Sequence, residues 1–415
     1  MTATAGLEGV TWVRLSFVDV RGVSNSVIVP SDRFDTVLRH GQPFDGSALE
    51  GRVRTLESDM LVRPVPSTLV RIAPGIARVV CTIHRPDGTR WSADSRQALE
   101  SAPEHFSLPE RMTVSAELEW YLLDGSGNPV DNAGYFDESE STGGVVVRGV
   151  ADQLLASGIP VDACHHEAGP GQYEIDIGAL PPLELADALV LAKQVIRERA
   201  SDAGLRATFM ARPFAELPGS GLHVHQHGNG ELLDDDGNLT AEGSCFVAGQ
   251  LAHAQGLCAL AAPTVNSYKR LHSGPEAPAV VVWAHANRAA LMRVSSYRGA
   301  DASIEYRGAD PSTNPYLLLA GLFAAAADGL DRKLPLPSPT EEAVGGFDPV
   351  ISEVRFAPLP RSLDEALDAL VSDDVLLDAF DGELLNRFVD ARRAEAEDFR
   401  AYVTGWERDH YLDEA

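Results

Sequence analysis

The sequence is poor in cysteine and contains no long apolar run. Its 415 residues include only four cysteines, Cys81, Cys164, Cys245 and Cys258, which are widely spaced and form no CxxC pair. This spacing argues against a disulfide framework or a zinc site and is typical of reduced thiols. No apolar stretch approaches the length of a membrane span, and the first residues lack the basic start and apolar stretch of a signal peptide. We therefore expect a cytoplasmic protein.

Basic residues are also scarce. The chain has 34 Lys and Arg residues against 61 Asp and Glu residues, which gives a formal net charge of -27. Binding of nucleic acid requires a basic surface, because Lys and Arg must neutralise the phosphate groups. The composition therefore argues against a nucleic-acid partner, and we interpret most of the acidic residues as a solvated surface.

Two common nucleotide-binding motifs are missing as well. The sequence contains neither a GxxxxGK[ST] P-loop nor a GxGxxG pattern. The folds that bind nucleotides through these glycine-rich loops are therefore disfavoured. If the chain binds a nucleotide, other residues must hold its phosphates.

Length and pattern together predict two domains, because 415 residues exceed what one compact core usually contains. We expect a β-rich domain over residues 1–100. Apolar residues alternate with polar ones in residues 11–20, which predicts a half-buried strand, and residues 26–29 predict the return strand. A third strand is expected near residues 77–83. Residues 41–68 are rich in Gly, Pro, Ser and Asp and are predicted to form a long functional loop.

The second domain is expected over residues 101–415, where strands alternate with longer helices. This pattern predicts an α/β or α+β fold class. Residues 183–203 have helical periodicity and are followed by Gly204, a suitable C-cap. Residues 314–329 begin with Asn-Pro and predict an apolar helix that stops near the last of them. The Ser and Glu that bound residues 362–365 predict a capping box and a helical C-terminal region.

The segment VSAELEW, residues 114–120, carries two glutamates at strand spacing. Ser115, Glu117 and Glu119 would share one face of a strand. Two neighbouring carboxylates on a buried strand repel each other, and a divalent metal would relieve that repulsion. A solvated edge strand explains the same pattern, and this segment alone slightly favours the edge strand.

Two further segments combine glycine with metal-binding side chains. Glu167 and Glu174 flank a Gly-rich turn and could converge on one ion, although a surface turn followed by a strand is also consistent. In residues 219–225, His223 and His225 share a strand face behind two glycines, which permit close backbone approach. Two ordinary histidines would be the usual explanation of such a pair, but the glycines favour a ligand site.

The last segment places Glu305 and Arg307 on one strand face, with Arg288, Arg293 and Arg298 upstream. These arginines could be simple salt-bridge formers. In so acidic a chain, however, arginines beside carboxylates and glycine loops favour phosphoryl transfer. The four segments together offer five glutamates and one or two histidines. Such oxygen-rich ligation favours Mg²⁺ or Mn²⁺ over zinc.

The order of these and further segments resembles glutamine synthetase. The resemblance extends from about residue 10 to WERDHYL near the C-terminus. It implies a β-grasp N-terminal domain, a larger catalytic domain with a curved antiparallel sheet flanked by helices, and a homo-oligomeric ring of six or twelve subunits. The segments that carry it are FDGS (44–47), ESDM (57–60), ELEW (117–120), HHEAGPGQYEI (165–175), GSGLHVHQ (219–226), NSYKRL (266–271), EAP (276–278), NR…R (287–293) and IEYRGADPSTNPYLLLAGL (304–322).

The resemblance implies which residues bind two or three Mg²⁺ or Mn²⁺ ions and ATP. The ion beside the amino-acid substrate would be bound by Glu119, Glu167 and Glu174. The ion that bridges the ATP phosphates would be bound by Glu117, His223 and Glu305. The phosphates themselves would be bound by Arg288, Arg293 and His225.

The resemblance also implies the substrate-binding and catalytic residues. Arg270 would bind the substrate α-carboxylate and Arg307 its reacting carboxylate. Asp45, from a neighbouring subunit, would take a proton from the incoming ammonium, and Glu276 would lie on a flap over the site. The other substrate-binding residues would be Tyr135, Glu119, Gly219 and His223. The residues implied in the chemical step are Asp45, Glu276, Arg288 and Arg307.

The activity implied is phosphorylation of glutamate by ATP to γ-glutamyl phosphate, followed by attack of an amine. Ala48 follows FDGS where ammonia-using members have serine, which favours an alkylamine, a polyamine or ethanolamine as the amine. Glutamine synthetase activity on ammonia is the alternative. A non-catalytic regulator or scaffold is a third hypothesis, because Pro218 and Ser303 replace an Asn and an Arg of the family pattern.

Overall fold

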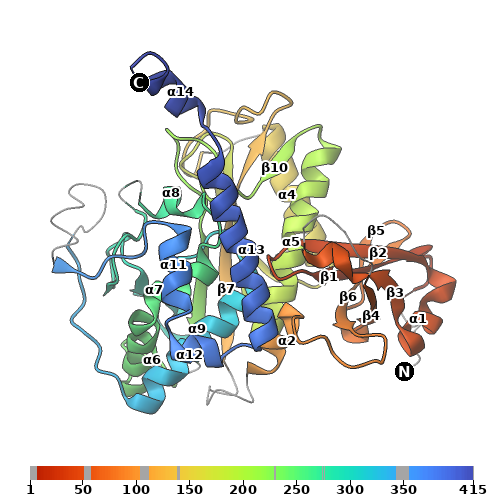
Figure 1. The fold of residues 1–415 in the computed structure, drawn as a ribbon, viewed down its shortest axis with the longest axis horizontal. Coiled ribbons are helices and arrows are strands. Elements are labelled where there is room, and N and C mark those ends of the chain that lie inside the picture. The colour runs from red at the N-terminus through yellow and green to blue at the C-terminus, as the bar shows by residue number, and fades with distance from the viewer. Residues whose placement is uncertain are drawn as a thin grey trace.

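A computed structural model describes residues 7–50, 58–102, 112–137, 141–228, 230–272, 274, 276–342 and 355–414. Figure 1 shows a smaller N-terminal part, in red and orange, beside a larger body that contains the rest of the chain. Each part contains its own sheet, one from residues 12–84 and one from residues 113–306. The predicted boundary between residues 100 and 101 stays a prediction.

The N-terminal sheet has the strand order β2-β1-β6-β4-β3, and β5 pairs with β6. Val13, Leu15 and Phe17 of the first strand are buried, as the alternation in residues 11–20 predicted. A short helix, α1 (Phe34–His40), follows the second strand. The strands are β1 (Trp12–Val18), β2 (Ser24–Pro30), β3 (Gln42–Asp45), β4 (Asp59–Pro64), β5 (Val70–Ala73) and β6 (Ile76–His84).

The strands predicted near residues 26–29 and 77–83 are confirmed as β2 and β6. The prediction that residues 41–68 form one long loop is wrong, because β3 and β4 lie within that segment and pair antiparallel. The reason is hydrophobic burial. Phe44 packs on Phe17 with ring centroids 4.9 Å apart, and Met60 is buried opposite Phe44. The turn-forming residues around these two side chains hide that signal in the sequence.

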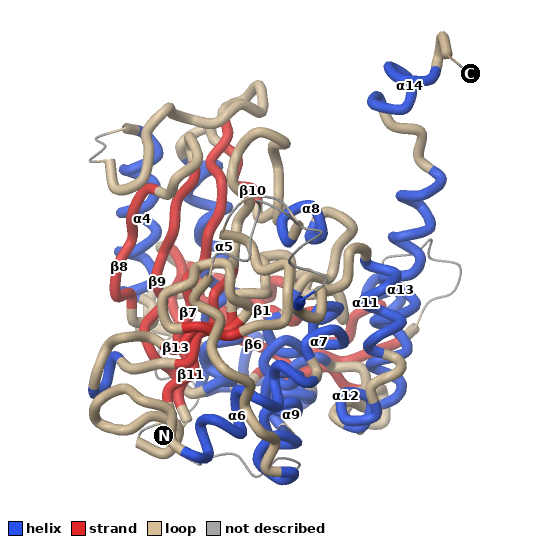
Figure 2. Tube along the Cα trace, turned by 90° about the vertical axis from the view of Figure 1, so that its left-hand side faces the viewer, coloured by secondary structure: helices blue, strands red, loops and turns tan. Residues whose placement is uncertain are grey.

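The second sheet has the strand order β12-β13-β14-β11-β7-β9-β8, and β10 pairs with β7. Its paired strands are antiparallel except β12 and β13. Figure 2 shows these strands in red, with helices around them. The strands are β7 (Thr113–Leu123), β8 (Val161–His166), β9 (Gln172–Leu180), β10 (Arg206–Thr208), β11 (Leu222–His227), β12 (Trp283–Ala284), β13 (Met292–Val294) and β14 (Ile304–Tyr306).

Helices cover this sheet and form the remaining body (Figure 2). Within the described residues, no helix is long and apolar enough to cross a membrane. Almost every residue of α9 is buried, so this helix forms the centre of the helical core. The helices are α2 (Ser95–Glu100), α4 (Thr142–Ala156), α5 (Pro182–Asp202), α6 (Ala241–Ala252), α7 (Ala254–Ala261), α8 (Ser267–Leu271), α9 (Pro315–Arg332), α11 (Leu363–Leu370), α12 (Asp374–Asp378), α13 (Gly382–Ala401) and α14 (Gly405–Tyr411).

The predicted end of α5 is confirmed. Gly204 follows the last turn with φ +73, and the Leu205 N–H donates to the Ala200 carbonyl at 2.8 Å. A residue in this left-handed conformation favours glycine because a Cβ would clash with the backbone. The capping box at Ser362 is confirmed in one half only. Ser362 accepts a hydrogen bond from the Glu365 N–H, but the Glu365 carboxylate accepts from Arg361.

Helix α9 begins as predicted, since the Asn314 side chain accepts a hydrogen bond from the Tyr316 N–H at 3.1 Å. Its predicted end near Gly329 is wrong, because the helix continues to Arg332. Gly329 is instead a contact point between helices. A Cβ at Gly329 would lie 2.2 Å from the carbonyl oxygen of Cys245 in α6, so only glycine lets the two helices approach so closely.

The turn between β1 and β2 connects the two parts of the molecule. The Asn314 side-chain amide donates to the Asp19 and Val20 carbonyls at 3.1 and 3.3 Å. From α13, Arg392 donates to the Arg21 carbonyl at 3.0 Å. Gly22 has φ +84, and a Cβ there would lie 2.9 Å from the Asn314 Cα. The start of α9 therefore fixes the position of this N-terminal turn.

His253 links the junction of α6 and α7 to α9 and to the N-cap of α12 through two carboxylates. It lies between α6 and α7, where its Nδ1 is 2.7 Å from Asp373 Oδ2 and its Nε2 is 3.1 Å from Asp328 Oδ2. Burial lowers the pKa of His253, but the hydrogen bonds to Asp373 and Asp328 outweigh burial and raise the net pKa above its ordinary value. The folded chain therefore favours the charged imidazolium.

This arrangement predicts a pH-dependent part of the folding stability. A histidine whose pKa is raised by folding stabilises fully below its unfolded pKa of about 6.5, and the stabilisation is lost as the pH rises through the folded value. We therefore expect His253→Gln to destabilise the chain more at about pH 6 than at about pH 9. Urea unfolding at both pH values measures the difference, with His410→Gln on the exposed α14 as the control. Equal losses at both pH values would contradict the prediction.

Candidate active site

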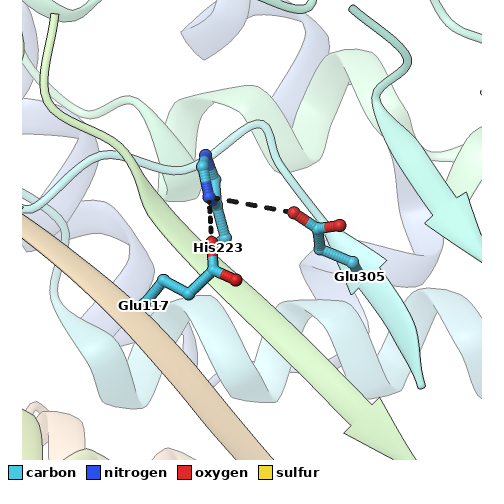
Figure 3. Close-up of side chains that lie close together, drawn as sticks. All are labelled: Glu117, His223 and Glu305. Carbon is cyan, nitrogen blue, oxygen red and sulfur yellow. Dashed lines mark hydrogen bonds and ion pairs between the residues drawn. The ribbon is translucent and has the colours of Figure 1, made fainter. Parts of the chain in front are cut away.

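Three neighbouring strands, β7, β11 and β14, build the first cluster of the site. Their register places His223 opposite Glu117 and His225 opposite Glu305. Figure 3 shows His223 between the two glutamates, with its Nδ1 2.7 Å from Glu117 Oε2 and 3.8 Å from Glu305 Oε1. One donor atom from each of Glu117, His223 and Glu305 lies within 4.8 Å of the others. These three side chains could therefore hold a metal ion.

Glu305 is the most buried carboxylate of this cluster, with an exposed fraction of 1%. Arg307 forms an ion pair with its Oε1, and Arg293 Nε lies 3.0 Å from its Oε2. Burial alone would raise the pKa of Glu305, but the charges of Arg307 and His225 hold the pKa below its ordinary value. The Arg307 guanidinium and the neighbouring His225 thus favour the ionised form of a buried carboxylate.

Glu117 is held by two histidines. His223 Nδ1 lies 2.7 Å from its Oε2, and His225 Nε2 lies 2.9 Å from its Oε1. Burial acts to raise the pKa of Glu117, yet the hydrogen bonds to His223 and His225 hold the pKa well below its ordinary value. The reciprocal effect raises the pKa of His225, against the opposing effect of burial. Glu117 is therefore an ionised carboxylate, the form that binds a hard cation.

Glu119 follows on the same face of β7 and is oriented by two donors. The Gly221 N–H and Gln172 Nε2 donate to its Oε2 at 2.9 and 3.0 Å. A Cβ at Gly221 would lie 2.7 Å from both Arg270 and His223 side-chain nitrogens. This confirms that glycine before the two histidines permits the close approach expected from the sequence. Any other residue would displace the side chains around Glu119.

A second cluster lies on β8 and β9. His165 Nε2 is 3.1 Å from Glu174 Oε1, and His165 Nδ1 is 3.7 Å from Glu167 Oε1. In the described part of the chain, the compact donor group here consists of His165, Glu174 and Asp176. Glu119, Glu167 and Glu174 form no such group among the same residues. Their assignment to one ion stays a prediction.

The carboxylates of this second cluster lie close to other carboxylates, and the positive groups nearby do not offset their negative charge. Burial and the charge of Glu119 raise the pKa of Glu167 to about 7. Burial and the same neighbouring charge raise the pKa of Glu174 to about 11. Such shifts arise where carboxylates crowd together in a low-dielectric site, and a divalent cation would offset their repulsion. The donor set therefore fits Mg²⁺ or Mn²⁺.

The predicted arginines lie at two depths. Arg270 is buried, and its guanidinium donates to the Arg307 carbonyl at 3.2 Å, so these two arginines form the inner part of the site. Arg288 is exposed, with its Nη1 3.8 Å from Glu276 Oε2. The exposed Tyr135 ring lies 5.8 Å from the His165 ring. Arg288, Glu276 and Tyr135 therefore form the outer part of the site.

Asp45 is the predicted catalytic residue that the fold keeps apart from these clusters. It ends β3, where its Oδ1 accepts hydrogen bonds from the backbone N–H groups of Ser47 and Ser58 at 3.0 and 3.2 Å. Figure 1 shows β3 on the N-terminal part, well away from β7. Within one chain, Asp45 therefore does not meet the Glu117 cluster.

Comparisons with known proteins agree with this geometry. Residues 9–86 match the family model of the glutamine synthetase beta-Grasp domain, and residues 92–411 match that of the glutamine synthetase catalytic domain. The chain belongs to the glutamine synthetase family. The resemblance drawn from the sequence motifs and the predicted β-grasp and catalytic architecture are thus confirmed. Like the family, it is an ATP-dependent ligase that forms C–N bonds.

Several relatives match over nearly the whole chain. The glutamine synthetase of Thermotoga maritima is 37% identical over 425 residues, which cover 98% of this chain and 97% of the relative. That of Thermus thermophilus is 37% identical over 432 residues, covering 98% and 96%. A solved GmaS/ADP complex is 26% identical with a TM-score of 0.89, and the match covers 100% of this chain and 99% of that one.

Two positions that depart from the glutamine synthetase family pattern, Ser303 and Pro218, form hydrogen-bond contacts. The Ser303 hydroxyl lies 3.1 Å from His225 Nδ1. Arg298, which could have replaced the missing arginine at position 303, instead pairs with the exposed Asp236 at 3.1 Å. The Pro218 carbonyl accepts a hydrogen bond from the Tyr121 hydroxyl at 2.8 Å. The side chain of Ala48 lies outside the described residues.

Sequence reasoning missed two residues that position the metal-binding side chains. Gln172 is buried and donates to Glu119 and to the Gly219 carbonyl, at 3.0 and 3.1 Å. Asp131 accepts hydrogen bonds from His166 and Tyr173, which flank the turn between Glu167 and Glu174. Gln172 lies inside the segment HHEAGPGQYEI, but its role depends on its burial, which the sequence alone does not reveal. Asp131 lies in a segment with no pattern that could have revealed it.

Proposed function

We propose that this chain is a γ-glutamyl–amine ligase, which uses ATP to join the γ-carboxylate of glutamate to an alkylamine, a polyamine or ethanolamine. One observation carries the proposal. Arg307, which is expected to bind the reacting carboxylate, forms a buried ion pair with Glu305, which is expected to bind the metal ion at the ATP phosphates. Arg270 donates to the carbonyl of the same Arg307, so both guanidinium groups are fixed relative to Glu305. A reaction that phosphorylates a carboxylate requires such a connection.

The described side chains suit the two halves of this reaction. Arg270 would bind the α-carboxylate of glutamate, and Arg307 would bind the carboxylate that is phosphorylated. Arg288, Arg293 and His225 would bind the ATP phosphates and stabilise the negative charge that develops during transfer. Transfer of the γ-phosphoryl group of ATP to the γ-carboxylate would release ADP and give γ-glutamyl phosphate. The amine would then attack the acyl carbon, displace inorganic phosphate and lose its proton.

The metal ions would be held by the carboxylates and the histidine already described. Glu117, His223 and Glu305 would hold an ion at the phosphates, and Glu119, Glu167 and Glu174 would hold one beside the amino acid. When bound, Mg²⁺ or Mn²⁺ supplies positive charge that polarises the phosphoryl oxygens and lowers their mutual repulsion. The raised pKa values of Glu167 and Glu174 support this assignment, because a cation would relieve the crowding of charge.

The amine half of the proposal rests on the outer part of the site. Glu167 and the exposed Tyr135 lie around His165, and Glu276 lies near Arg288. This acidic surrounding would attract a protonated amine, and a carboxylate must then remove its proton before attack. Ala48 in place of serine removes a hydroxyl and leaves room for carbon on the amine. The fold match to the solved GmaS/ADP complex supports the binding of an adenine nucleotide at the same site.

Assembly into a ring of six or twelve subunits is part of this proposal. Asp45 would serve the amine pocket of a neighbouring subunit, which is consistent with its distance from β7 within one chain. The C-terminal segment that includes α14 projects from the body in Figures 1 and 2 and exposes Trp406 and Leu412 by 59% and 72%. Exposed apolar side chains on a projecting segment support contact with another subunit.

Glutamine synthetase activity on ammonia is the second candidate, favoured by the names of the relatives that are 37% identical over almost the whole chain. Purified protein with ATP, Mg²⁺ and glutamate should be given ammonia, methylamine, ethanolamine or putrescine in parallel. Phosphate release and the product mass are then measured. We expect the mass of a γ-glutamyl amide of one carbon-bearing amine. A clear preference for ammonia would overturn the amine assignment and leave the ligase assignment intact.

A further inference from the structure

A cavity of about 520 Å³ lies apart from the candidate active site, at the contact between the N-terminal part and the catalytic body. Its walls come from the β1–β2 turn, from α5, from β10 and the residues after it, and from the segment that precedes α9. Its volume falls in the range of small-molecule pockets, which is about 300–1,000 Å³. The predicted metal, ATP and substrate residues are absent from its lining.

The charge of this cavity is opposite to that of the chain. Arg21, Lys193 and Arg197 line it, and its lining contains no Asp or Glu among the described residues. The whole chain carries a formal net charge of -27. These three cations are a local exception in an acidic protein, although Asp19, which lies outside the lining, pairs with Arg21. A pocket lined by cations attracts anions.

Lys193 is buried in the cavity wall and pairs only with neutral groups. Its Nζ donates to the Pro311 and Thr313 carbonyls at 3.1 and 3.4 Å, and no carboxylate of the described chain forms an ion pair with it. Burial and the nearby charge of Arg197 lower the pKa of Lys193 to about 8, while Asp310 acts at longer range to raise it. An ammonium group has three donors, so one remains for a ligand.

Arg197 and Arg21 also have N–H donors that could bind a ligand. The Arg197 guanidinium lies over the Phe209 ring, 4.8 Å from its centroid, and forms no ion pair within the described ranges. Arg197 is an exposed residue, although burial of part of its side chain lowers its pKa. Arg21 pairs with Asp19 at 3.1 Å, but its buried Nε has no hydrogen-bond partner among those residues. An anion between the two guanidinium groups would satisfy these donors.

We propose that this cavity binds a small organic anion that carries a carboxylate or phosphate group and a short apolar portion. The three cations would hold the charged group, and Val190, Phe209 and Met210 in the lining would contact the apolar portion. The buried ammonium of Lys193 favours occupation, because a buried cation with no carboxylate partner is costly and an anion removes that cost. The proposal does not depend on the amine used at the active site.

The position of the cavity connects it to the catalytic sheet. Pro311 in its wall belongs to the segment that runs from Arg307, just after β14, to the start of α9. Another part of the wall is the β1–β2 turn, to whose carbonyls Asn314 donates two hydrogen bonds. An anion that contacts both Arg21 and Lys193 would therefore link the N-terminal turn to the segment that follows Arg307.

The test is calorimetric titration of the full-length protein with two probes, succinate as a dicarboxylate and inorganic phosphate as a phosphate source. We expect one or both probes to bind, and we expect Arg197→Gln to weaken that binding by about tenfold or more, as loss of a charge-assisted hydrogen bond implies. Arg199→Gln, on the same helix, and Arg293→Gln, at the predicted ATP site, should leave the binding unchanged. The probe that binds identifies the anionic group.

Other results would overturn the proposal. Absence of binding by both probes to the unaltered protein would refute it. So would binding that Arg293→Gln abolishes and Arg197→Gln leaves unchanged, because the anion would then occupy the candidate active site. If Arg197→Gln fails to fold, Arg21→Gln replaces it, since this turn residue is partly exposed and its loss should weaken binding in the same way.

Discussion

The Arg307→Ala variant is expected to lose both its ligase activity and a large part of its folding stability. Arg307 forms an ion pair with the buried Glu305, and its Nε donates to the Arg288 carbonyl at 3.0 Å. Removing it leaves a carboxylate that is 1% exposed with Arg293 as its remaining arginine partner among the described residues. Breaking a buried ion pair by removing one partner costs about 3–5 kcal/mol. Urea unfolding and phosphate release measure the two losses separately.

Arg307→Lys distinguishes charge from geometry. Lysine keeps the positive charge but lacks the planar fork that reaches both Glu305 and a substrate carboxylate. We therefore expect the lysine variant to recover much of the stability while its activity stays low. Arg298→Ala is the matched control, because that side chain is 72% exposed and its ion pair among the described residues is with an exposed aspartate. If Arg307→Ala unfolds no more easily than the parent, the role given to this buried pair is wrong.

The strand periodicity of the sequence located most side chains of the first cluster. Alternation along VSAELEW, residues 114–120, placed Glu117 and Glu119 on one face, and Leu118 and Trp120 are fully buried on the other. The alternation of buried and polar residues along one strand does not reveal which other strand it pairs with. The register that brings His223 opposite Glu117 depends on long-range pairing of β7 with β11, about 100 residues apart along the chain. Family resemblance supplied this link, whereas local pattern could not.

The features that the sequence did not reveal depend on contacts between distant segments. Met60 lies among turn-forming residues, and only its packing against Phe44 and the strands beside it makes this segment part of a sheet. Gly329 looked like a helix end because glycine is common there, but its role is a helix contact with Cys245. Gln172 and Asp131 act by hydrogen bonds to residues far along the chain. None of these partners can be read from local spacing.

Glu117→Gln is expected to weaken Mn²⁺ binding by more than about 100-fold, because even residues that only orient a metal ligand contribute about 10- to 100-fold to metal affinity. Glu117 is an ionised carboxylate that contacts His223 and His225. Glutamine keeps the shape of this side chain but removes its charge, and its NH₂ group would face one of the histidines. ATP-dependent activity should fall together with Mn²⁺ affinity. Titration followed by electron paramagnetic resonance measures that affinity.

Glu117→Gln distinguishes loss of metal binding from loss of folding, because Glu117 is only partly buried. We expect Glu117→Gln to keep the near-ultraviolet circular dichroism of the parent, in contrast to Arg307→Ala. Glu184→Gln, at the exposed first turn of α5, removes the same charge away from the site and should leave Mn²⁺ affinity unchanged. Unaltered Mn²⁺ affinity in Glu117→Gln would mean that the donor group of β7, β11 and β14 does not hold the ion. The buried Glu305 and its arginines would then be a purely electrostatic contact to phosphate.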